Sequence, residues 1–158
     1  MSTNAPRRPR ANKGKCTFQI VASQFNSQYV RGLVDHAEKE LRSLASSAAI
    51  SIHRVPGSFQ IPLVVRELAR KKKSNAIIAC GVILQGETNH AQNLSRSVTD
   101  ALQRIAVEHA VAVINVVLRF DNATQARARC LENKINRGTE AARAAVEIAN
   151  LLLDLRGS

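Results

Sequence analysis

Hydrophobic residues along the chain gather in four short runs, separated by longer stretches in which apolar positions recur every three or four residues. The short runs are rich in valine, isoleucine and alanine, and they alternate only weakly with polar residues. This pattern is typical of β-strands that are covered on both faces, as in a parallel sheet. The predicted strands cover residues 17–23, 48–55, 76–83 and 111–118.

The stretches between these runs have the spacing of amphipathic helices. Tyr29, Leu33 and Ala37 recur at intervals of four, which places them on one face of a helix. Asn136 precedes the last stretch and belongs to a residue type that caps helix N-termini. The predicted helices cover residues 29–44, 59–73, 94–109, 124–132 and 137–155.

Strands that alternate with helices favour a parallel sheet with helices on both faces. We therefore predict an α/β fold, a three-layer α/β/α sandwich with a four-stranded parallel sheet in flavodoxin-like order, formed by residues 16–158. Apolar residues make up 45% of the 158-residue chain, enough for the core of one domain. Residues 1–15 are predicted to be a basic, flexible tail.

The tail contributes five of the positive charges behind the net charge of +11, and it has no acidic residue. Such a segment fits a solvated terminus, and it also allows non-specific, salt-dependent contact with nucleic acid. A stacking platform for single strands is not expected, because aromatic residues make up only 3% of the chain. Neither a secretory signal nor a membrane-spanning run is found, so we expect a cytoplasmic protein without membrane association. The tail cations are Arg7, Arg8, Arg10, Lys13 and Lys15.

Known catalytic and metal-binding signatures are missing from the sequence. Cys16, Cys80 and Cys130 stand far apart and suit neither a disulfide framework nor a zinc site, and Cys80 is predicted to be a core residue. There is no Walker loop, GxGxxG turn, GxSxG elbow or HExxH pair. We therefore expect no metal site, and the sequence gives no support to nucleotide hydrolysis, serine hydrolysis or zinc chemistry.

Candidate chemistry concentrates in the loops that follow the strands, where open parallel sheets bind ligands. In the third loop, Gly86 lets the backbone approach a ligand closely, and residues 87–90 open a helix whose free N–H groups favour an anion. His90 lies in the first turn of that helix. The positive helix end there favours a neutral imidazole that can accept a proton. Taken alone, His90 also fits a surface or packing residue.

Four stretches of the chain resemble the lumazine synthase family, in the same order and with matching spacing. The resemblance covers nearly everything after the tail. Residues 55–62 (VPGSFQIP) are similar to the family's VPGAFEIP, and residues 81–90 (GVILQGETNH) to its GxVIRGxTxH. The remaining stretches are Phe25-Asn26, after the first strand, and Gln125-Ala126, Arg129 and residues 136–142, which are similar to QAxxRAG followed by NKGxEAA.

The resemblance implies a step of riboflavin biosynthesis. The ring amine of 5-amino-6-(D-ribitylamino)uracil condenses with the ketone of 3,4-dihydroxy-2-butanone 4-phosphate, phosphate leaves, and the ring closes to 6,7-dimethyl-8-ribityllumazine. It implies neither a metal nor an organic cofactor. The reaction needs proton transfer, an anion site and the alignment of two substrates.

The resemblance also implies binding roles for single residues. Phe25 would stack on the pyrimidine ring, although a phenylalanine at a strand end also fits a core role. Ser58 and Gln60 would bond the ribityl hydroxyls, although both also suit turn and helix capping. Glu87 and Thr88 would offer backbone N–H groups to the phosphate.

The catalytic residues implied by the resemblance are His90, Arg129 and Glu140. His90 would transfer protons, Arg129 would hold the phosphate with its planar fork, and Glu140 would orient Arg129 or assist proton transfer. Arg129 also fits a solvated residue of a basic helix. Backbone groups near Ile114 and Asn115 would read the edge of the pyrimidine. The other implied binding residues are Gly57, Val82 and Arg137.

The chain departs from the family pattern near the implied pockets. Gln24 and Gln85 have neutral amide side chains where the family has arginine, and Gln60 has one where the family has glutamate. These departures keep open a second interpretation, a weakly active paralogue of the same fold that forms a shell or binds a ligand. The others are Arg137 for lysine, Val116 for glycine, and Arg119-Phe120 for a pair of threonines.

Self-association follows from the resemblance as well. One subunit would supply the stretches at Phe25, Ser58–Gln60 and 87–90, and its neighbour those at 114–115, Arg129 and Arg137. We therefore expect at least a pentamer, which would extend to a 60-subunit icosahedral shell. Riboflavin synthase is a further candidate partner. An Ala-rich face in residues 141–149 would allow close packing between subunits, although an internal core would explain it equally.

Overall fold

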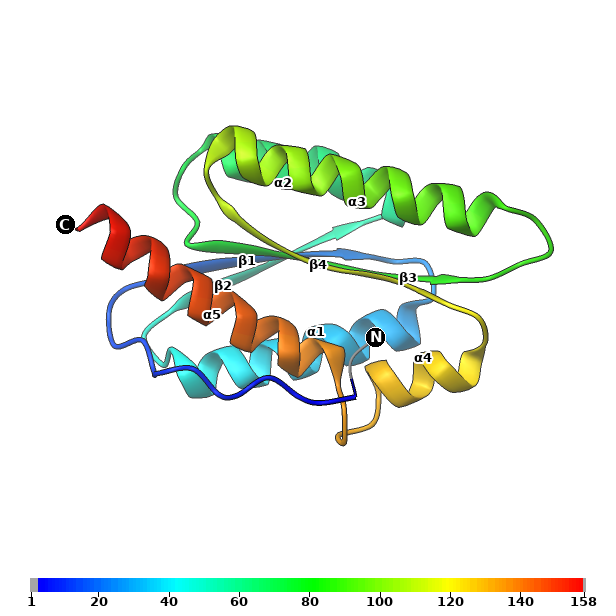
Figure 1. Cartoon of the computed structure of the whole chain (residues 1–158), viewed down its shortest axis with the longest axis horizontal. Coiled ribbons are helices and arrows are strands. Elements are labelled where there is room, and N and C mark those ends of the chain that lie inside the picture. Colours follow the sequence, from blue (N-terminus) through cyan, green and yellow to red (C-terminus); the bar gives the residue numbers. More distant parts are fainter. Residues whose placement is uncertain (1–2, 158) are drawn as a thin grey trace.

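A four-stranded parallel sheet runs through the middle of the molecule, with helices on both of its faces (Figure 1). The computed structural model describes residues 3–157. The strands are β1 (Thr17–Ser23), β2 (Ala49–Val55), β3 (Ala76–Leu84) and β4 (Ala112–Phe120). They pair in the order β2-β1-β3-β4, all in parallel, which confirms the predicted flavodoxin-like order.

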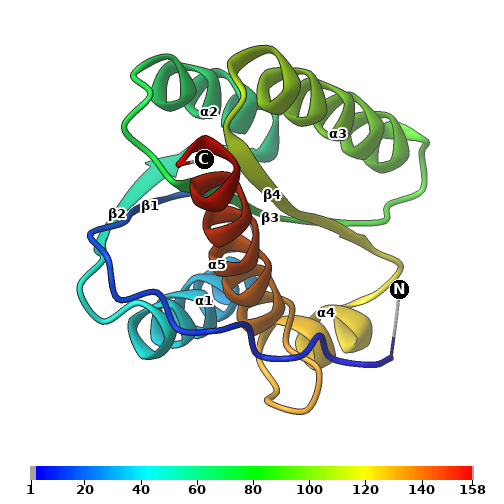
Figure 2. The same cartoon turned by 60° about the vertical axis from the view of Figure 1, so that its left-hand side comes forward.

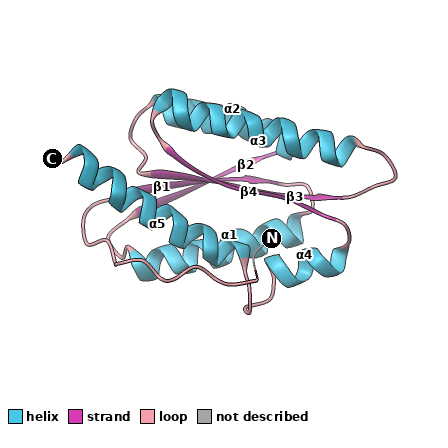
Figure 3. Cartoon of the chain, viewed as in Figure 1, coloured by secondary structure: helices cyan, strands magenta, loops and turns pink. Residues whose placement is uncertain are grey.

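The helices form the two outer layers of the sandwich (Figures 1 and 3). One layer contains α1, α4 and α5, and the other contains α2 and α3, as the turned view makes clear (Figure 2). The helices are α1 (Ser27–Leu44), a short 3-10 helix η1 (Ser58–Gln60), α2 (Ile61–Arg70), α3 (His90–His109), α4 (Ala123–Cys130) and α5 (Arg137–Arg156). Within the described residues, none of these helices is both long enough and apolar enough to cross a membrane.

The core consists of two clusters, one on each face of the sheet. Ile78 and Cys80 on β3 pack toward α1 and α5, while Ile77 and Ala79 on the same strand pack toward α2 and α3. Every residue of β3 up to Ile83 is buried, as expected for a strand covered on both faces. The predictions for this strand and for Cys80 are thereby confirmed.

Strand β2 differs from the prediction, because it is not covered on both faces. Ser51, Ile52 and Arg54 are exposed, and of the whole strand only Val55 is buried. The reason is that the helices pack mainly on β1, β3 and β4, and β2 lies at the edge of the sheet with β1 as its one strand neighbour. An apolar run by itself does not separate a central strand from an edge strand.

The ends of several elements also differ from the predicted bounds. Strands β3 and β4 continue to Leu84 and Phe120, because the β3–β4 ladder keeps its register that far. Helix α2 begins only after η1, with Pro62 near its start. Proline is tolerated there, because the first N–H groups of a helix have no partner within the helix. It ends at Arg70, short of the lysine cluster.

Asn136 caps α5 as predicted. Its side-chain oxygen accepts hydrogen bonds from the backbone N–H groups of Gly138 and Thr139, at 2.8 and 3.3 Å. Its amide nitrogen donates to the carbonyl oxygens of Cys130 and Glu132, each at 3.0 Å. One buried side chain thus joins the end of α4 to the start of α5.

Residues 3–16 have neither helix nor strand and lie along α1 and α5 (Figure 2). Arg8 pairs with Glu40 at 2.8 Å, and Arg10 pairs with Asp154 at 2.9 Å. Asn12 donates to Asn150 at 2.7 Å. Two of the five tail cations are therefore paired within the chain, and the flexibility of the tail stays a prediction.

The alanines of α5 serve the internal core. Ala141, Ala142, Ala145 and Ala149 are buried within this chain, and only Ala144 is partly exposed. The internal explanation therefore accounts for this Ala-rich face, and oligomerisation has to be argued from other residues.

Candidate active site

A pocket of about 350 Å³ opens at the carboxyl ends of β1 and β3, beside the start of α3. These strands are neighbours in the sheet, yet the chain leaves β1 for the α1 layer and β3 for the α3 layer. Such a switch point leaves a crevice between the two connections, and ligands of open α/β sheets bind there. The predicted residues that line the pocket are Phe25, Gly57, Ser58, Val82, Thr88 and His90.

Phe25 presents an aromatic ring at the edge of this pocket. Its side chain is 73% exposed, so the prediction of a stacking role agrees with its position better than a core role does. The next residue, Asn26, has a left-handed backbone (φ 54°) and donates from its amide nitrogen to the Val82 carbonyl oxygen at 2.7 Å. This hydrogen bond ties the β1–α1 turn to β3 and fixes where the ring stands.

Ser58 and Gln60 lie in the η1 turn and have different surroundings. Ser58 is buried against Gly81, where an added Cβ would come within 2.6 Å of the serine Oγ. Gly81 is therefore needed for this close approach. Gln60 does not line the pocket; its Oε1 accepts a hydrogen bond from the Gly57 backbone N–H at 3.0 Å, which is the capping role.

The third loop brings a helix start, where free N–H groups favour an anion, next to an imidazole. His90 is the first residue of α3, and its backbone N–H donates weakly to the Thr88 Oγ1 at 3.3 Å. Thr88 and His90 are both exposed and line the pocket, whereas Glu87 is not among the lining residues. The arrangement combines a flat apolar surface, backbone N–H donors for an anion and a proton-transfer group.

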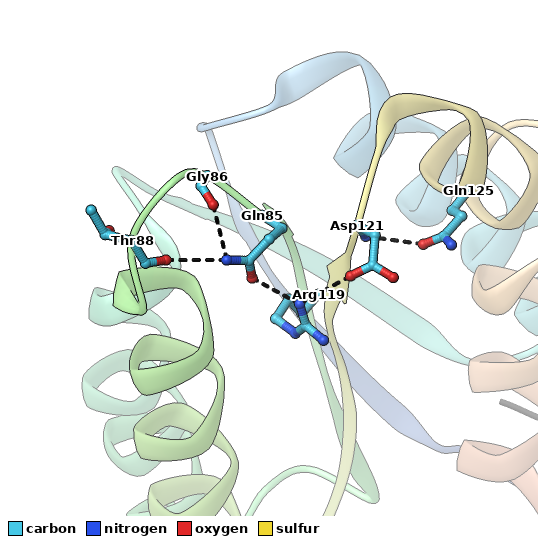
Figure 4. A network of polar contacts seen from close by, with 6 residues as sticks. All are labelled: Gln85, Gly86, Thr88, Arg119, Asp121 and Gln125. Atoms are coloured by element: carbon cyan, nitrogen blue, oxygen red, sulfur yellow. Dashed lines mark hydrogen bonds and ion pairs between the residues drawn. The ribbon is translucent and has the colours of Figure 1, made fainter.

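A chain of polar contacts joins this loop to the end of β4 (Figure 4). Gln85 donates to the carbonyl oxygens of Gly86 and Thr88, at 3.0 and 3.1 Å. Its own side-chain oxygen accepts a hydrogen bond of 2.8 Å from Arg119, which also pairs with Asp121 at 3.2 Å. The sequence predictions gave none of these side chains a role in the site.

Four of the other predicted residues line a second pocket of about 320 Å³, between β4 and α5. Ile114 and Asn115 come from the edge strand, and Arg137 and Glu140 come from the first turn of α5. The two pockets share no lining residue. One chain therefore holds the predicted residues in two separate groups.

Arg129 belongs to neither group. It lies partly buried on α4 and, within the part of the chain that the structure describes, has no hydrogen bond or ion pair. An unpaired guanidinium on a helix surface remains available to an anion or to another subunit.

Phe59 and Leu94 are among the pocket residues that the sequence predictions did not name as site residues. Phe59 is 67% exposed and lines the first pocket beside Phe25, and Leu94 of α3 lines it as well. Phe59 stands in the VPGSFQIP stretch, so the motif could have drawn attention to it. Leu94 follows the ordinary helical spacing of core residues, and the sequence contains no signal that separates it from them.

Thiol and metal chemistry receive no support from the described residues. Burial raises the pKa of the Cys80 thiol, and that of Cys130, to about 12, which keeps both thiols protonated near neutral pH. Among residues 3–157 there is no group of three histidine, cysteine, aspartate or glutamate side chains placed to hold a metal ion.

Comparison with known proteins agrees with the sequence motifs. The family model of 6,7-dimethyl-8-ribityllumazine synthase matches residues 15–153. The lumazine synthase of Azoarcus sp. (strain BH72) is 38% identical over 134 residues, which are 84% of this chain and 83% of that protein. Those of Paraburkholderia phymatum and Polaromonas sp. (strain JS666) are 38% and 34% identical, over 86% and 89% of this chain and 77% and 90% of their own length. The chain belongs to the 6,7-dimethyl-8-ribityllumazine synthase family.

Proposed function

We propose that the chain condenses 5-amino-6-(D-ribitylamino)uracil with 3,4-dihydroxy-2-butanone 4-phosphate, releasing phosphate and water and forming 6,7-dimethyl-8-ribityllumazine in riboflavin biosynthesis. The relatives that cover most of the chain have the name of this enzyme. The observation that carries the proposal is the pocket at the switch point, where Phe25, Ser58, Thr88 and His90 converge.

The pyrimidine substrate would lie against Phe25. Its flat ring matches the exposed aromatic face, which favours stacking. Ser58, at the buried wall of the pocket, offers a hydroxyl to the ribityl chain. Gln60 would have to give up its hydrogen bond with the Gly57 N–H to bind the same chain. Gly57 and Val82 would contribute backbone and apolar surface.

The phosphate-bearing substrate would bind at the start of α3. The backbone N–H groups of Glu87 and Thr88 precede the helix, where the aligned peptide dipoles attract an anion. His90 stands in the same turn and lines the pocket, so it would transfer the protons that imine formation and loss of phosphate require. This arrangement needs no metal ion.

A second subunit would complete each site. Because Ile114, Asn115, Arg137 and Glu140 line a different pocket, they would reach the substrates of the neighbouring chain instead of their own. Arg129, which lacks a partner among the described residues, would bind the phosphate across the same interface. The proposed unit is a pentamer of 17.2 kDa chains, about 86 kDa, in a closed ring.

Larger assembly and location are part of the same proposal. Twelve pentamers would close into a 60-subunit shell, and riboflavin synthase would be a partner in the cytoplasm. The net charge of +11 per chain opposes close assembly at low salt. Light scattering at moderate salt would distinguish the pentamer from the shell.

Incubation of the purified protein with both substrates tests the proposed activity. The absorbance of the lumazine should rise in proportion to enzyme concentration and stop rising when either substrate is left out. The control is Arg42→Ala, which removes an exposed ion pair with Glu38 on α1 and should keep wild-type turnover. Failure of the wild-type protein to form the lumazine would reject the proposal.

A further inference from the structure

Gln85 connects the loop of the first pocket to the edge strand of the sheet (Figure 4). Its backbone N–H donates to the Phe120 carbonyl oxygen at 2.8 Å, which extends the β3–β4 ladder by one residue. Its side-chain nitrogen donates to the carbonyl oxygens of Gly86 and Thr88. Hydrogen bonds thereby hold both the backbone and the side-chain amide of Gln85 in place.

These two side-chain hydrogen bonds determine where the backbone N–H groups of the loop point. A trans peptide unit is planar, so its C=O and N–H bonds face opposite ways. Holding the Gly86 carbonyl toward Gln85 turns the N–H of Glu87 away from Gln85, and holding the Thr88 carbonyl does the same for Asn89. The loop therefore presents N–H donors on the side opposite to Gln85.

Arg119 fixes which way the Gln85 amide faces. Its Nη1 donates to Gln85 Oε1 at 2.8 Å, so the amide nitrogen must face the loop. A reversed amide would lose all three side-chain hydrogen bonds. Arg119 is itself held by Asp121, whose backbone N–H donates to Gln125 Oε1 at 2.9 Å, and Gln125 belongs to α4.

We propose that Gln85 and Arg119 are positioning residues that orient the N–H groups of Glu87 and Asn89, in loop 86–89, toward the phosphate of the substrate. The inference rests on the proposed function for the identity of that anion. Neither side chain needs to touch the substrate.

Steady-state kinetics separate positioning from general stability. Gln85→Ala and Arg119→Ala should each raise the KM for the butanone phosphate about tenfold, which is the effect of losing one hydrogen bond between a loop N–H group and the phosphate. The KM for the pyrimidine should stay within about twofold of the wild-type value. The double variant should be no worse than Gln85→Ala, because both changes remove the same device. Arg42→Ala is the matched control. A parallel rise of both KM values, or multiplied effects in the double variant, would overturn the proposal.

Gln85→Glu distinguishes the hydrogen bond that Gln85 accepts from Arg119 from the two that it donates to the loop. The carboxylate still accepts from Arg119 but donates nothing to Gly86 or Thr88. It should therefore raise the KM for the butanone phosphate as much as Gln85→Ala does. Wild-type KM values in Gln85→Glu would contradict the role assigned to the donated hydrogen bonds.

Hydrogen exchange tests the same device without turnover. Amides of residues 86–90 should exchange faster in Gln85→Ala than in wild type, and inorganic phosphate should protect them in wild type only. Equal exchange in both proteins, or equal protection by phosphate, would reject the positioning role. A wild-type protein that forms no lumazine would reject the proposed function, and exchange would still decide whether Gln85 orients the loop.

Discussion

Glu140 forms an ion pair with Arg137, three residues earlier on α5, and not with Arg129. Both side chains of the pair are largely buried at the wall of the second pocket. The expected orientation of Arg129 by Glu140 therefore does not occur within one chain. The pair instead holds Arg137 in a fixed direction at the start of α5, and Arg129 stays available for an anion.

His90 should be the residue whose loss affects turnover most among those of the first pocket. Replacement by alanine removes the proposed proton-transfer group beside the proposed phosphate site and should lower kcat by about 10-fold to 100-fold. Alignment of the two substrates supplies much of the remaining rate. Stopped-flow absorbance of the lumazine measures the effect, and wild-type turnover in the variant would remove His90 from the mechanism.

Arg129→Ala should weaken the binding of the phosphate-bearing substrate. The loss of a hydrogen bond to a charged group costs roughly 1.5–3 kcal/mol, so kcat/KM for the butanone phosphate should fall by one to two orders of magnitude. Kinetics with each substrate varied in turn provide the measurement. An effect confined to the pyrimidine substrate would contradict the assignment.

Asn136→Ala should destabilise the fold by about 1–3 kcal/mol, because it removes a helix cap and takes the side-chain donor away from the buried Cys130 carbonyl oxygen and the part-buried Glu132 carbonyl oxygen. Asn122→Ala is the matched control. Asn122 also caps a helix, α4, but its oxygen accepts only from Gln125 and it is exposed, so the cost should be smaller. Urea unfolding compares the two, and an equal or larger loss in Asn122→Ala would be inconsistent with this account.

The buried thiols should make the fold sensitive to alkaline pH. Burial raises the pKa of Cys80 and of Cys130 from 9.0 to about 12. Between these values the unfolded chain binds fewer protons than the folded chain, so stability falls as pH rises from 9 to 12. Urea unfolding at several pH values should show a shallower decline in the Cys80→Ala, Cys130→Ala double variant. An unchanged slope would mean that other groups cause the decline.

Local patterns were sufficient for most of the fold. The continuous apolar run at 76–83 predicted the central strand, and Asn136 before an Ala-rich stretch predicted the start of α5. Both signals depend on neighbouring residues alone. The exposure of β2 was not predictable in this way, because it depends on the strand's place at the edge of the sheet.

The motifs named several residues of the candidate site but not their arrangement. The motifs predicted Phe25, Ser58 and His90, which converge in one pocket. The contact between Gln85 and Arg119 was missed, because it depends on the register that pairs the ends of β3 and β4. The division of the predicted residues between two pockets likewise depends on which face of the sheet each helix covers.

Recovery of activity in mixed subunits tests the shared site most directly. His90→Ala and Arg129→Ala chains are each defective in one half of a site, and co-expression in equal amounts gives assemblies that contain both. If each site takes His90 from one chain and Arg129 from its neighbour, about a quarter of the sites regain both residues. At a butanone phosphate concentration well below KM, the mixed protein should then form the lumazine at about a quarter of the wild-type rate, well above either variant alone. A rate equal to the mean of the two separate variants would contradict the account.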